Sequence, residues 1–560
     1  MAIDRASTRE WAGAGAAARA REASPLSREW TGAAAVVALL MAAPLAYLAF
    51  RAITGGPETW RLLWSTRLPG LLVNTLGLTA VVTAASILLG VPLAWLVERT
   101  DLPGRRLWRW ILALPLVIPP YVGAVIYTSV FGPRGFLEVT LESWLGREPF
   151  TFHLPSIYSL WGTALVLVLF TYPYVYLLAL AVLRTLNRSL EEAARACGHR
   201  PWSVFFRVTL PLMRPGIAAG ALLVALYALS DFGAVSLLRY QTFTYSIYLQ
   251  LTGRYDRTAA AALSLVLAAI TLSVLWMEAR ARGRAQYYQT ASTWRPFRPV
   301  PLGGWRIAGI AAVALVAAAS LLLPLGSLVV WTAQGLVDRS AVAAVWAGTA
   351  EGLWRPALHS VAASAVAATE SVVLALPLAY LAARDRTPRG RVLTWLAQAG
   401  YALPGVVVAL SMVFLVNRFL PWLYGTAAIV VLAYVVRFLP QALQAEEAAL
   451  AQVSPNLEEA ARSLGRRAWQ TLLAVVAPLI SGGLLTAWAM VFLTALKELP
   501  ATLLLRPAGF DTLPVRIWMP GAEGLYAQAA PAALVLIVCS TLPMALLLTR
   551  GGRLGLPGVS

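Results

Sequence analysis

Charged residues are scarce in this chain of 560 residues. Asp, Glu, Lys and Arg make up 13% of it and hydrophobic residues 59%, and the mean hydropathy is +0.69. A soluble domain carries about 25% charged residues. The composition therefore excludes an ordinary water-soluble protein and predicts an integral membrane protein.

Lysine, cysteine and histidine are rare as well. Lys497 is the single lysine, and it lies in TALKELP without the glycine-rich turn of a phosphate-binding loop, so we expect no ATPase site on this chain. The two cysteines, Cys197 and Cys539, fall in a loop and in an apolar run, which argues against a disulfide. His153 and His359 have no further ligand at metal-binding spacing, so we expect neither a metal site nor a catalytic centre.

Long apolar runs dominate the sequence. A membrane-spanning helix needs about 20 mostly apolar residues. About twelve such runs lie at 32–50, 71–97, 110–131, 157–183, 216–238, 258–277, 306–331, 357–383, 392–416, 424–444, 481–505 and 525–549. We therefore predict an all-α integral membrane protein with about twelve transmembrane helices, six in each half.

The net charge of +19 comes almost entirely from arginine. The arginines are spread over the loops, which argues against a nucleic-acid-binding surface. With a cytoplasmic N-terminus, the Arg-rich loops 98–109, 279–305 and 384–391 all fall on the cytoplasmic side, as the positive-inside rule requires. Loop 51–70, with three arginines, is the one outer loop that fits poorly. We therefore predict that both termini are cytoplasmic.

The runs and loops divide the chain into five parts. We predict a cytoplasmic N-terminal tail at 1–31, a first transmembrane domain at 32–278, a cytoplasmic linker at 279–305, a second transmembrane domain at 306–550 and a cytoplasmic C-terminal tail at 551–560. The first of these lacks the pattern of a cleaved signal peptide. Six spans per domain leave both domains in the same orientation, so the domains form a parallel repeat.

One segment occurs twice. Residues 189–211 read SLEEAARACGHRPWSVFFRVTLP, and residues 456–478 read NLEEAARSLGRRAWQTLLAVVAP, at an offset of 267. Similarity also links GVPLAWLVERTDLPGR at 90–105 with ALPLAYLAARDRTPRGR at 375–391, at an offset of 285. A repeat that lies between apolar runs indicates two copies of one membrane module.

Each copy of the repeated segment predicts two short helices between two spans. Residues 189–192 and 456–459 have the spacing of a capping box, in which Ser189 or Asn456 begins the first helix. Gly198 and Gly465 stand where a left-handed C-cap would end that helix. A second amphipathic stretch follows and stops near the proline that closes each copy. The residues that define the motif are Glu192, Ala193, Ala194, Gly198, Pro211, Glu459, Ala460, Ala461, Gly465 and Pro478.

These residues resemble the EAA signature in permease subunits of bacterial ABC importers of the type I (MetI-like) fold. The signature is EAA, then glycine, then a hydrophobic-x-Leu-Pro ending. The matches are Glu192, Ala193, Ala194, Gly198, Val208, Leu210 and Pro211 in the first copy, and Glu459, Ala460, Ala461, Gly465, Val475 and Pro478 in the second, with Ala477 in place of the leucine. In that family the segment is the coupling helix, which docks into a cleft on the ATPase subunit.

The resemblance implies partners. One fused chain would supply both permease domains, and two ATP-binding cassette ATPase subunits would bind it, one at each motif. A periplasmic or lipid-anchored binding protein would deliver the substrate. ATP would be used by the partner subunits, and this chain would bind no cofactor of its own. The resemblance also implies the bacterial inner membrane as the location.

Charged residues inside the apolar runs form a second pattern. A charge at the bilayer centre costs about 2.5–3.5 kcal/mol on insertion scales, so each must face protein or water. Asp231 and Glu498 differ by 267, as do Arg239 and Arg506, and Lys497 precedes Glu498. These five residues are our candidates for the translocation path. The alternative is a structural role, in which Lys497 neutralises Glu498 and Asp231 bonds a neighbouring helix.

Gly233 and Pro500 follow the two acids closely, and we expect each to break its helix there. Segments 497–518 and 230–248 resemble the corresponding stretches of ferric iron permeases of this superfamily. Fused permeases for thiamine and for aminoethylphosphonate share the architecture and remain alternatives. An ion-driven secondary transporter with parallel repeats is a further alternative from another class.

Overall fold

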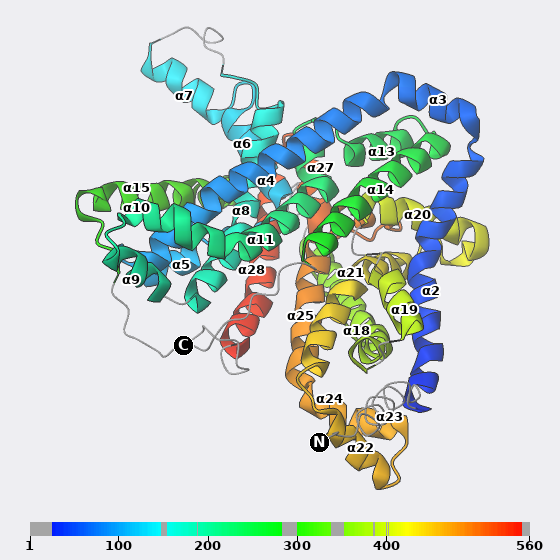
Figure 1. The fold of residues 1–560 in the computed structure, drawn as a ribbon. Helices are drawn as coiled ribbons and strands as arrows, with labels where there is room; N and C mark the ends of the chain where they lie inside the picture. The colour runs from blue at the N-terminus through cyan, green and yellow to red at the C-terminus, as the bar shows by residue number, and fades with distance from the viewer. Residues whose placement is uncertain are drawn as a thin grey trace, which may run out of the picture. The chain divides into compact units, whose positions relative to one another are not determined.

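The computed structural model describes residues 25–146, 154–186, 189–282, 299–337, 352–384, 387–398, 400 and 403–551. Within these ranges the chain is helical, and its β-structure is one isolated bridge between Thr100 and Val300 (Figure 1). The all-α prediction is therefore confirmed. By its contacts the chain divides into two compact units. Unit 1 comprises Met1–Ala43, Ala368–Tyr401 and Phe438–Val491, and unit 2 comprises Pro44–Ala367, Ala402–Arg437 and Phe492–Ser560.

The first half of the chain contains both long helices and short interrupted ones. Its elements are α2 (Pro25–Thr54), α3 (Gly56–Thr66), α4 (Leu68–Arg99), α5 (Arg105–Ile111), η1 (Leu114–Val117), α6 (Pro120–Phe131), α7 (Phe136–Trp144), α8 (Leu160–Thr185), α9 (Ser189–Ala196), α10 (Pro201–Val204), η2 (Phe205–Thr209), α11 (Leu210–Ser230), α12 (Gly233–Leu237), α13 (Phe243–Thr252) and α14 (Arg257–Arg282).

The second half follows a similar order. Its elements are η3 (Gly303–Trp305), α15 (Arg306–Ala317), η4 (Ala318–Leu322), α16 (Leu323–Val337), α18 (Trp354–Arg384), α19 (Pro388–Gln398), α20 (Gly405–Phe419), η7 (Pro421–Leu423), α21 (Ala427–Leu450), α22 (Pro455–Ser463), α23 (Ala468–Thr471), η8 (Leu472–Val476), α24 (Ala477–Leu479), α25 (Ser481–Leu496), α26 (Pro500–Leu505), α27 (Leu513–Ala522) and α28 (Tyr526–Gly551).

Eight helices in the described ranges are long and apolar enough to cross a membrane, and two bent helix pairs raise the number to ten. Two shorter apolar helices, Gly405–Phe419 and Tyr526–Thr541, lie in two further runs that the sequence suggested as spans. The multi-pass architecture is confirmed, whereas the number twelve stays a prediction.

The predicted continuous span at 110–131 is wrong. The helix pair Arg105–Val117 and Pro120–Trp144 is bent by 92°. Three prolines at 115, 119 and 120 lie at the bend, and proline has no N–H to continue a helix. Two buried tyrosines satisfy carbonyls beside the break. Tyr172 Oη donates to Leu112 O at 2.9 Å, and Tyr176 Oη donates to Arg109 O at 3.2 Å.

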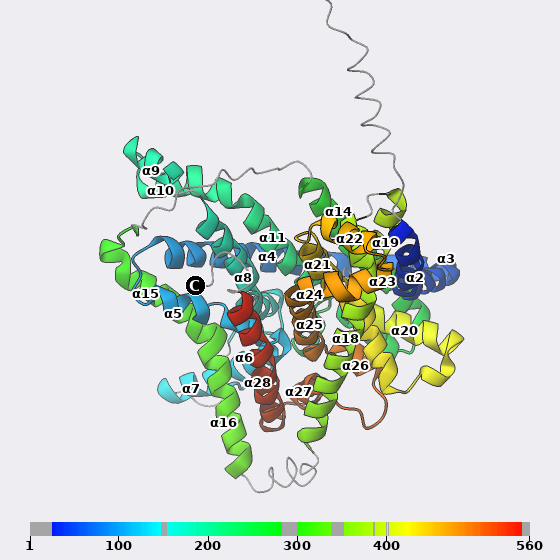
Figure 2. The same cartoon turned by 90° about the horizontal axis from the view of Figure 1, so that it is seen from below.

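Close packing of α4, α8 and α11 forms the core of unit 2 in the first half (Figure 1). A Cβ on Gly90 of α4 would lie 3.0 Å from Tyr176 N, and a Cβ on Gly220 of α11 would lie 2.7 Å from Val175 Cα. Glycine therefore lets both helices approach the backbone of α8, as small residues do in membrane bundles. In the same unit, α16 lies beside α28 (Figure 2).

Breaks interrupt the helices that carry the two intramembrane acids. Helix α11 ends at Ser230 and α12 begins at Gly233, while α25 ends at Leu496 and α26 begins at Pro500. The expected breaks at Gly233 and Pro500 are confirmed. The runs 216–238 and 481–505 are therefore not single helices.

Candidate functional site

The first helix of each repeated motif ends in a left-handed glycine. Gly198 has φ of 84° and Gly465 has φ of 82°. The N–H groups of Gly198 and His199 donate to Arg195 O at 2.9 Å and Ala194 O at 3.2 Å. The second copy repeats this arrangement, with Gly465 N–H to Arg462 O at 2.9 Å and Arg466 N–H to Ala461 O at 3.2 Å. Both ends are Schellman motifs, so the predicted C-caps are confirmed.

The start of the second motif differs from the prediction. Helix α22 begins at Pro455 and its N-cap is Ser454, which makes no side-chain cap hydrogen bond. Asn456 therefore lies inside the first turn, and the capping box with Glu459 is wrong. Proline at the first helical position explains the shift, because its fixed φ suits a helix start and its missing N–H is not needed there. In the first copy the two residues before Ser189 lie outside the described ranges. The capping box between Ser189 and Glu192 therefore stays a prediction.

A π-helical turn follows in both copies, at Phe205–Thr209 and Leu472–Val476. In the first copy the chain continues through Pro211 into α11 without a stop, so the predicted end near Pro211 is wrong. The wider turn relieves the clash between the proline ring and the carbonyl four residues earlier. In the second copy α24 ends at Leu479, one residue after Pro478, as expected.

Much of each motif is exposed. Glu192, Ala193 and Gly198 are exposed in the first copy, and Glu459, Ala460 and Gly465 are exposed in the second. Large apolar side chains accompany them, namely Leu190, Trp202, Leu457, Leu464 and Trp469. Exposed apolar groups beside polar ones are typical of a surface that meets another protein.

The preceding glutamates, Glu191 and Glu458, are buried, and sequence analysis did not select them. The guanidinium Nε of Arg99 lies 3.4 Å from Glu191 Oε1, and Thr209 Oγ1 donates to the same oxygen at 3.0 Å. Arg99 is only 2% exposed, although the sequence placed it in a loop. The sequence does contain a signal for them, since a pair of adjacent glutamates occurs in both copies at the offset of 267.

The second copy has the matching contact. Arg384 donates to Glu458 Oε1 from Nε at 3.0 Å and from Nη2 at 2.8 Å. Tyr380 Oη donates to Glu458 Oε2 at 2.6 Å. Arg384 Nη2 also donates to Val453 O at 2.8 Å. Arg384, like Arg99, is the last residue of a long helix and does not lie in the predicted loop.

The two intramembrane acids have matching positions in unit 2. Asp231 Oδ2 accepts the N–H groups of Ala234 at 3.1 Å and Val235 at 3.2 Å. Glu498 Oε1 accepts the N–H of Ala501 at 3.3 Å. Each acid thus binds the first turn of a short helix, where a negative charge is stabilised by the helix dipole. Both acids are buried, at 8% and 5% exposure.

Arg437, and not Lys497, is the cation that pairs with Glu498. Lys497 Nζ donates instead to Leu116 O at 3.1 Å. The pairing of Lys497 with Glu498, which the structural alternative assumed, is therefore wrong. Asp231 likewise makes its side-chain bonds to the residues that follow it and not to a distant neighbouring helix.

The structure brings the two breaks together within unit 2. A Cβ on Gly233 would lie 2.7 Å from Tyr121 Cβ and 3.1 Å from Leu499 Cδ2. Gly405 packs against the Arg437–Glu498 pair, so a Cβ there would overlap both side chains. The break after Asp231 and the break after Glu498 therefore face each other in a densely packed region.

The two matched arginines have other partners. The Cζ of Arg239 lies 5.7 Å from the ring centroid of Tyr158, and Arg239 has a left-handed φ of 52°. Arg506 forms an ion pair with Asp511 and donates to Met519 Sδ at 3.3 Å. Of the five candidate path residues, only Lys497 and Glu498 are neighbours in the sequence. The contacts of Arg239 and Arg506 are with groups other than Asp231 and Glu498.

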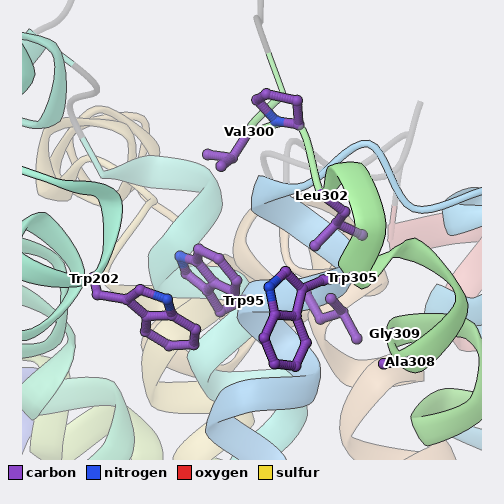
Figure 3. Close-up of a pocket in the computed structure, with 9 residues that line it drawn as sticks. Trp95, Trp202, Val300, Leu302, Trp305, Ala308 and Gly309 are labelled. Atoms are coloured by element: carbon purple, nitrogen blue, oxygen red, sulfur yellow. The ribbon is translucent and has the colours of Figure 1, made fainter.

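One apolar pocket of about 360 Å³ lies beside α10 in unit 2. Figure 3 shows Trp95, Trp202 and Trp305 around it, with Leu302 and Val300 at its edge. The rings of Trp95 and Trp202 are 6.0 Å apart between centroids. No charged side chain is among the lining residues, so the pocket offers apolar contact and little to select a polar ligand.

No group of three or more His, Cys, Asp or Glu side chains that could hold a metal ion occurs in the described part of the chain. His359 stacks on Phe510 at 4.4 Å between centroids, and its Nδ1 lies 3.0 Å from Asp511 O. His153 lies outside the described residues.

Comparison with known proteins identifies the family. The family model of the "binding-protein-dependent transport system inner membrane component" matches residues 87–284 and again 375–550. An Fe(3+)-transport system permease protein of Haemophilus influenzae is 32% identical over 90% of this chain and 94% of that protein. A ferric transport system permease protein of Actinobacillus pleuropneumoniae is 24% identical over 76% of this chain and 63% of that protein.

The thiamine transport system permease protein of Escherichia coli is 26% identical over 78% of this chain and 81% of that protein. The two matches of the family model contain the two motif helices, α9 and α22. They also contain both intramembrane acids. The chain therefore belongs to the inner membrane components of binding-protein-dependent transport systems, with the family's domain present twice.

Proposed function

We propose that this chain is the permease subunit of an ABC importer that carries ferric iron across the bacterial inner membrane. The observation that carries the proposal is the 32% identity to a ferric permease over 90% of the chain. The thiamine permease matches less of the chain at 26% identity, which makes thiamine the second candidate. The chain is a transport component, and ATP hydrolysis belongs to separate subunits.

Two ATPase subunits are the proposed partners, one at α9 and one at α22. The exposed Glu192 and Glu459, with Leu190 and Leu457 next to them in each helix, support this proposal. Both motifs then lie on the cytoplasmic face, as do both termini, and the Arg-rich loops support that orientation. A binding protein delivers substrate to the opposite face.

Asp231 and Glu498 are the proposed centre of the translocation path, with Lys497, Arg239 and Arg506 along it. Two carboxylates on matching breaks suit a cationic cargo, because an opposite charge offsets the cost of burying a cation. Closure of the ATPases shifts the permease between two states, since the ATPases contact the two states differently.

Uptake in proteoliposomes tests this function. The chain is reconstituted with the ATPase that co-purifies from its native membrane and with the binding protein, and the entry of radiolabelled ferric iron and of labelled thiamine is followed with and without ATP. ATP-dependent iron entry is expected. Entry of thiamine alone would move the assignment to the second candidate, and entry driven by an ion gradient without ATPase would refute an ABC permease.

A further inference from the structure

Each motif helix is joined by a buried carboxylate to the end of a long helix of its own copy. In unit 2, Glu191 of α9 binds Arg99, the last residue of α4. In unit 1, Glu458 of α22 binds Arg384, the last residue of α18. The two carboxylates have exposures of 7% and 2%. The contact recurs in both copies, between segments that the sequence repeats at offsets of 285 and 267, so it belongs to the repeated module.

We propose that Glu191 and Glu458 are positioning residues that fasten each coupling helix to the second long helix of its copy, through Arg99 and Arg384. A displacement of α9 or α22 by an ATPase is thereby passed directly to α4 or α18. The exposed Glu192 and Glu459 face the partner, and the buried glutamates face the membrane helices. The inference rests on the proposed function of these helices as ATPase docking sites.

The charges themselves favour a rigid connection. Two charges attract more strongly in a water-poor environment than at an exposed surface. Charge-assisted hydrogen bonds are stronger than neutral ones, and Arg384 donates two of them, from Nε and Nη2, to the single oxygen Oε1 of Glu458.

In each copy a further hydrogen bond ties the carboxylate or its arginine to a third segment. Thr209, in the π turn η2, donates to Glu191 at 3.0 Å, so α9, α4 and η2 meet at one carboxylate. In the other copy Arg384 also holds the carbonyl of Val453 at 2.8 Å, just before α22. The helix and the chain that enters it are thus held by one arginine.

In the first copy the path from α4 into the bundle is continuous. Helix α4 packs on α8 and α11, and a Cβ at Gly90 would already lie 3.0 Å from the backbone of α8. A helix so closely packed cannot absorb a shift of its end without moving its neighbours. Movement at Arg99 therefore reaches α11, the helix that ends directly before Asp231.

Glu98 supplies a matched control. It is buried beside Arg99 at 8% exposure, and it pairs with Arg109 at 2.8 Å and Arg184 at 3.5 Å. These partners lie on α5 and α8, not on the coupling helix. Glu98→Gln therefore removes a similar buried charge at the same end of α4 without loosening α9.

The test compares the double variant Glu191→Gln/Glu458→Gln with Glu98→Gln in proteoliposomes that contain the ATPase and the iron-loaded binding protein. We expect the double variant to keep its ATPase and its basal hydrolysis but to lose about tenfold or more in iron transported per ATP, the range of a typical coupling between sites. We expect Glu98→Gln to keep the wild-type ratio. An unchanged ratio in the double variant, equal loss in the control, or loss of ATPase binding would each overturn the proposal.

Milder variants cover the case in which the double variant fails to accumulate. Thr209→Val and Tyr380→Phe each remove one hydrogen bond to a glutamate and leave the ion pair in place. Together they should lower iron per ATP by several-fold, and a wild-type ratio would refute the proposal. Stimulation of ATP hydrolysis by the loaded binding protein is measured in parallel. If the wild type transports no iron, the proposed function has failed. The positioning role is then tested only by whether the double variant loses the stimulation of ATP hydrolysis that the loaded binding protein causes in the wild type.

Discussion

The ammonium group of Lys497 donates a hydrogen bond of 3.1 Å to the carbonyl oxygen of Leu116. Leu116 lies in η1, within the bend of the first copy, and Lys497 directly precedes Glu498 at the break of the second copy. The only lysine of the chain therefore links the irregular segments of the two copies inside unit 2. The bond satisfies a carbonyl that a regular helix could not, because the residues three and four positions after Leu116 are prolines without an N–H.

Lys497→Met should lower the stability of the protein. The substitution keeps most of the side-chain volume but leaves Leu116 O without its donor, which costs about 1–3 kcal/mol for a buried acceptor. Thermal unfolding of the purified protein in detergent measures the loss. Lys497→Arg keeps a donor and serves as the control. A midpoint equal to wild type for Lys497→Met would show that another donor replaces the lysine.

Arg437→Gln should be more damaging. It leaves Glu498 buried at 5% exposure without its cation, and breaking a buried pair on one side costs about 3–5 kcal/mol. Arg437→Gln/Glu498→Gln removes both charges and should recover much of the stability in the same unfolding assay. If the double variant is less stable than Arg437→Gln, the pair is not the dominant interaction at this site.

Substitution by amides separates the two possible roles of the acids. Asp231→Asn and Glu498→Gln keep an oxygen that can accept the N–H groups of the following helix, but they remove the charge. If the acids attract a cation, the combined variant should lower iron uptake by about tenfold or more at normal membrane abundance, because the attraction scales with charge.

Alanine at both positions gives the contrasting case, since Asp231→Ala and Glu498→Ala also remove the helix cap, worth about 0.5–2 kcal/mol. Initial rates of radiolabelled iron entry, normalised to permease content, are the measurement. Wild-type uptake by the amide variants would make both acids structural.

Gly198→Val and Gly465→Val should impair coupled uptake. Both glycines have φ above 80°, a conformation that costs roughly 1–2 kcal/mol for other residues. A Cβ at either position meets no atom within 4 Å, so the effect arises from the backbone and not from a clash. We expect normal membrane insertion with loss of ATP-driven uptake.

Asn at the same two positions is the control, because asparagine adopts the left-handed region more readily. Uptake assays and membrane abundance are compared for all variants. Full uptake by the double valine variant would remove these helix ends from the coupling mechanism.

The predictions that are confirmed at single residues are those in which local chemistry decides the structure. The glycine caps at Gly198 and Gly465 and the breaks at Gly233 and Pro500 depend on backbone preferences that single residues impose. The prediction of one span at 110–131 is wrong because the apolar character of the run hid the effect of three prolines. The prediction at Asn456 is wrong as well, because Pro455 begins the helix and places the N-cap at Ser454, two residues earlier.

The membrane class, the duplication and the position of each motif can be read from the chain alone, because composition and repeats are properties of the sequence. Which charges meet depends instead on how the helices pack. Arg99 and Arg384 are loop-like in sequence and yet bind the buried Glu191 and Glu458, and Glu498 binds Arg437 and not its neighbour Lys497. A buried charge takes the partner that folding brings within reach, and that partner lies here on another helix tens of residues away.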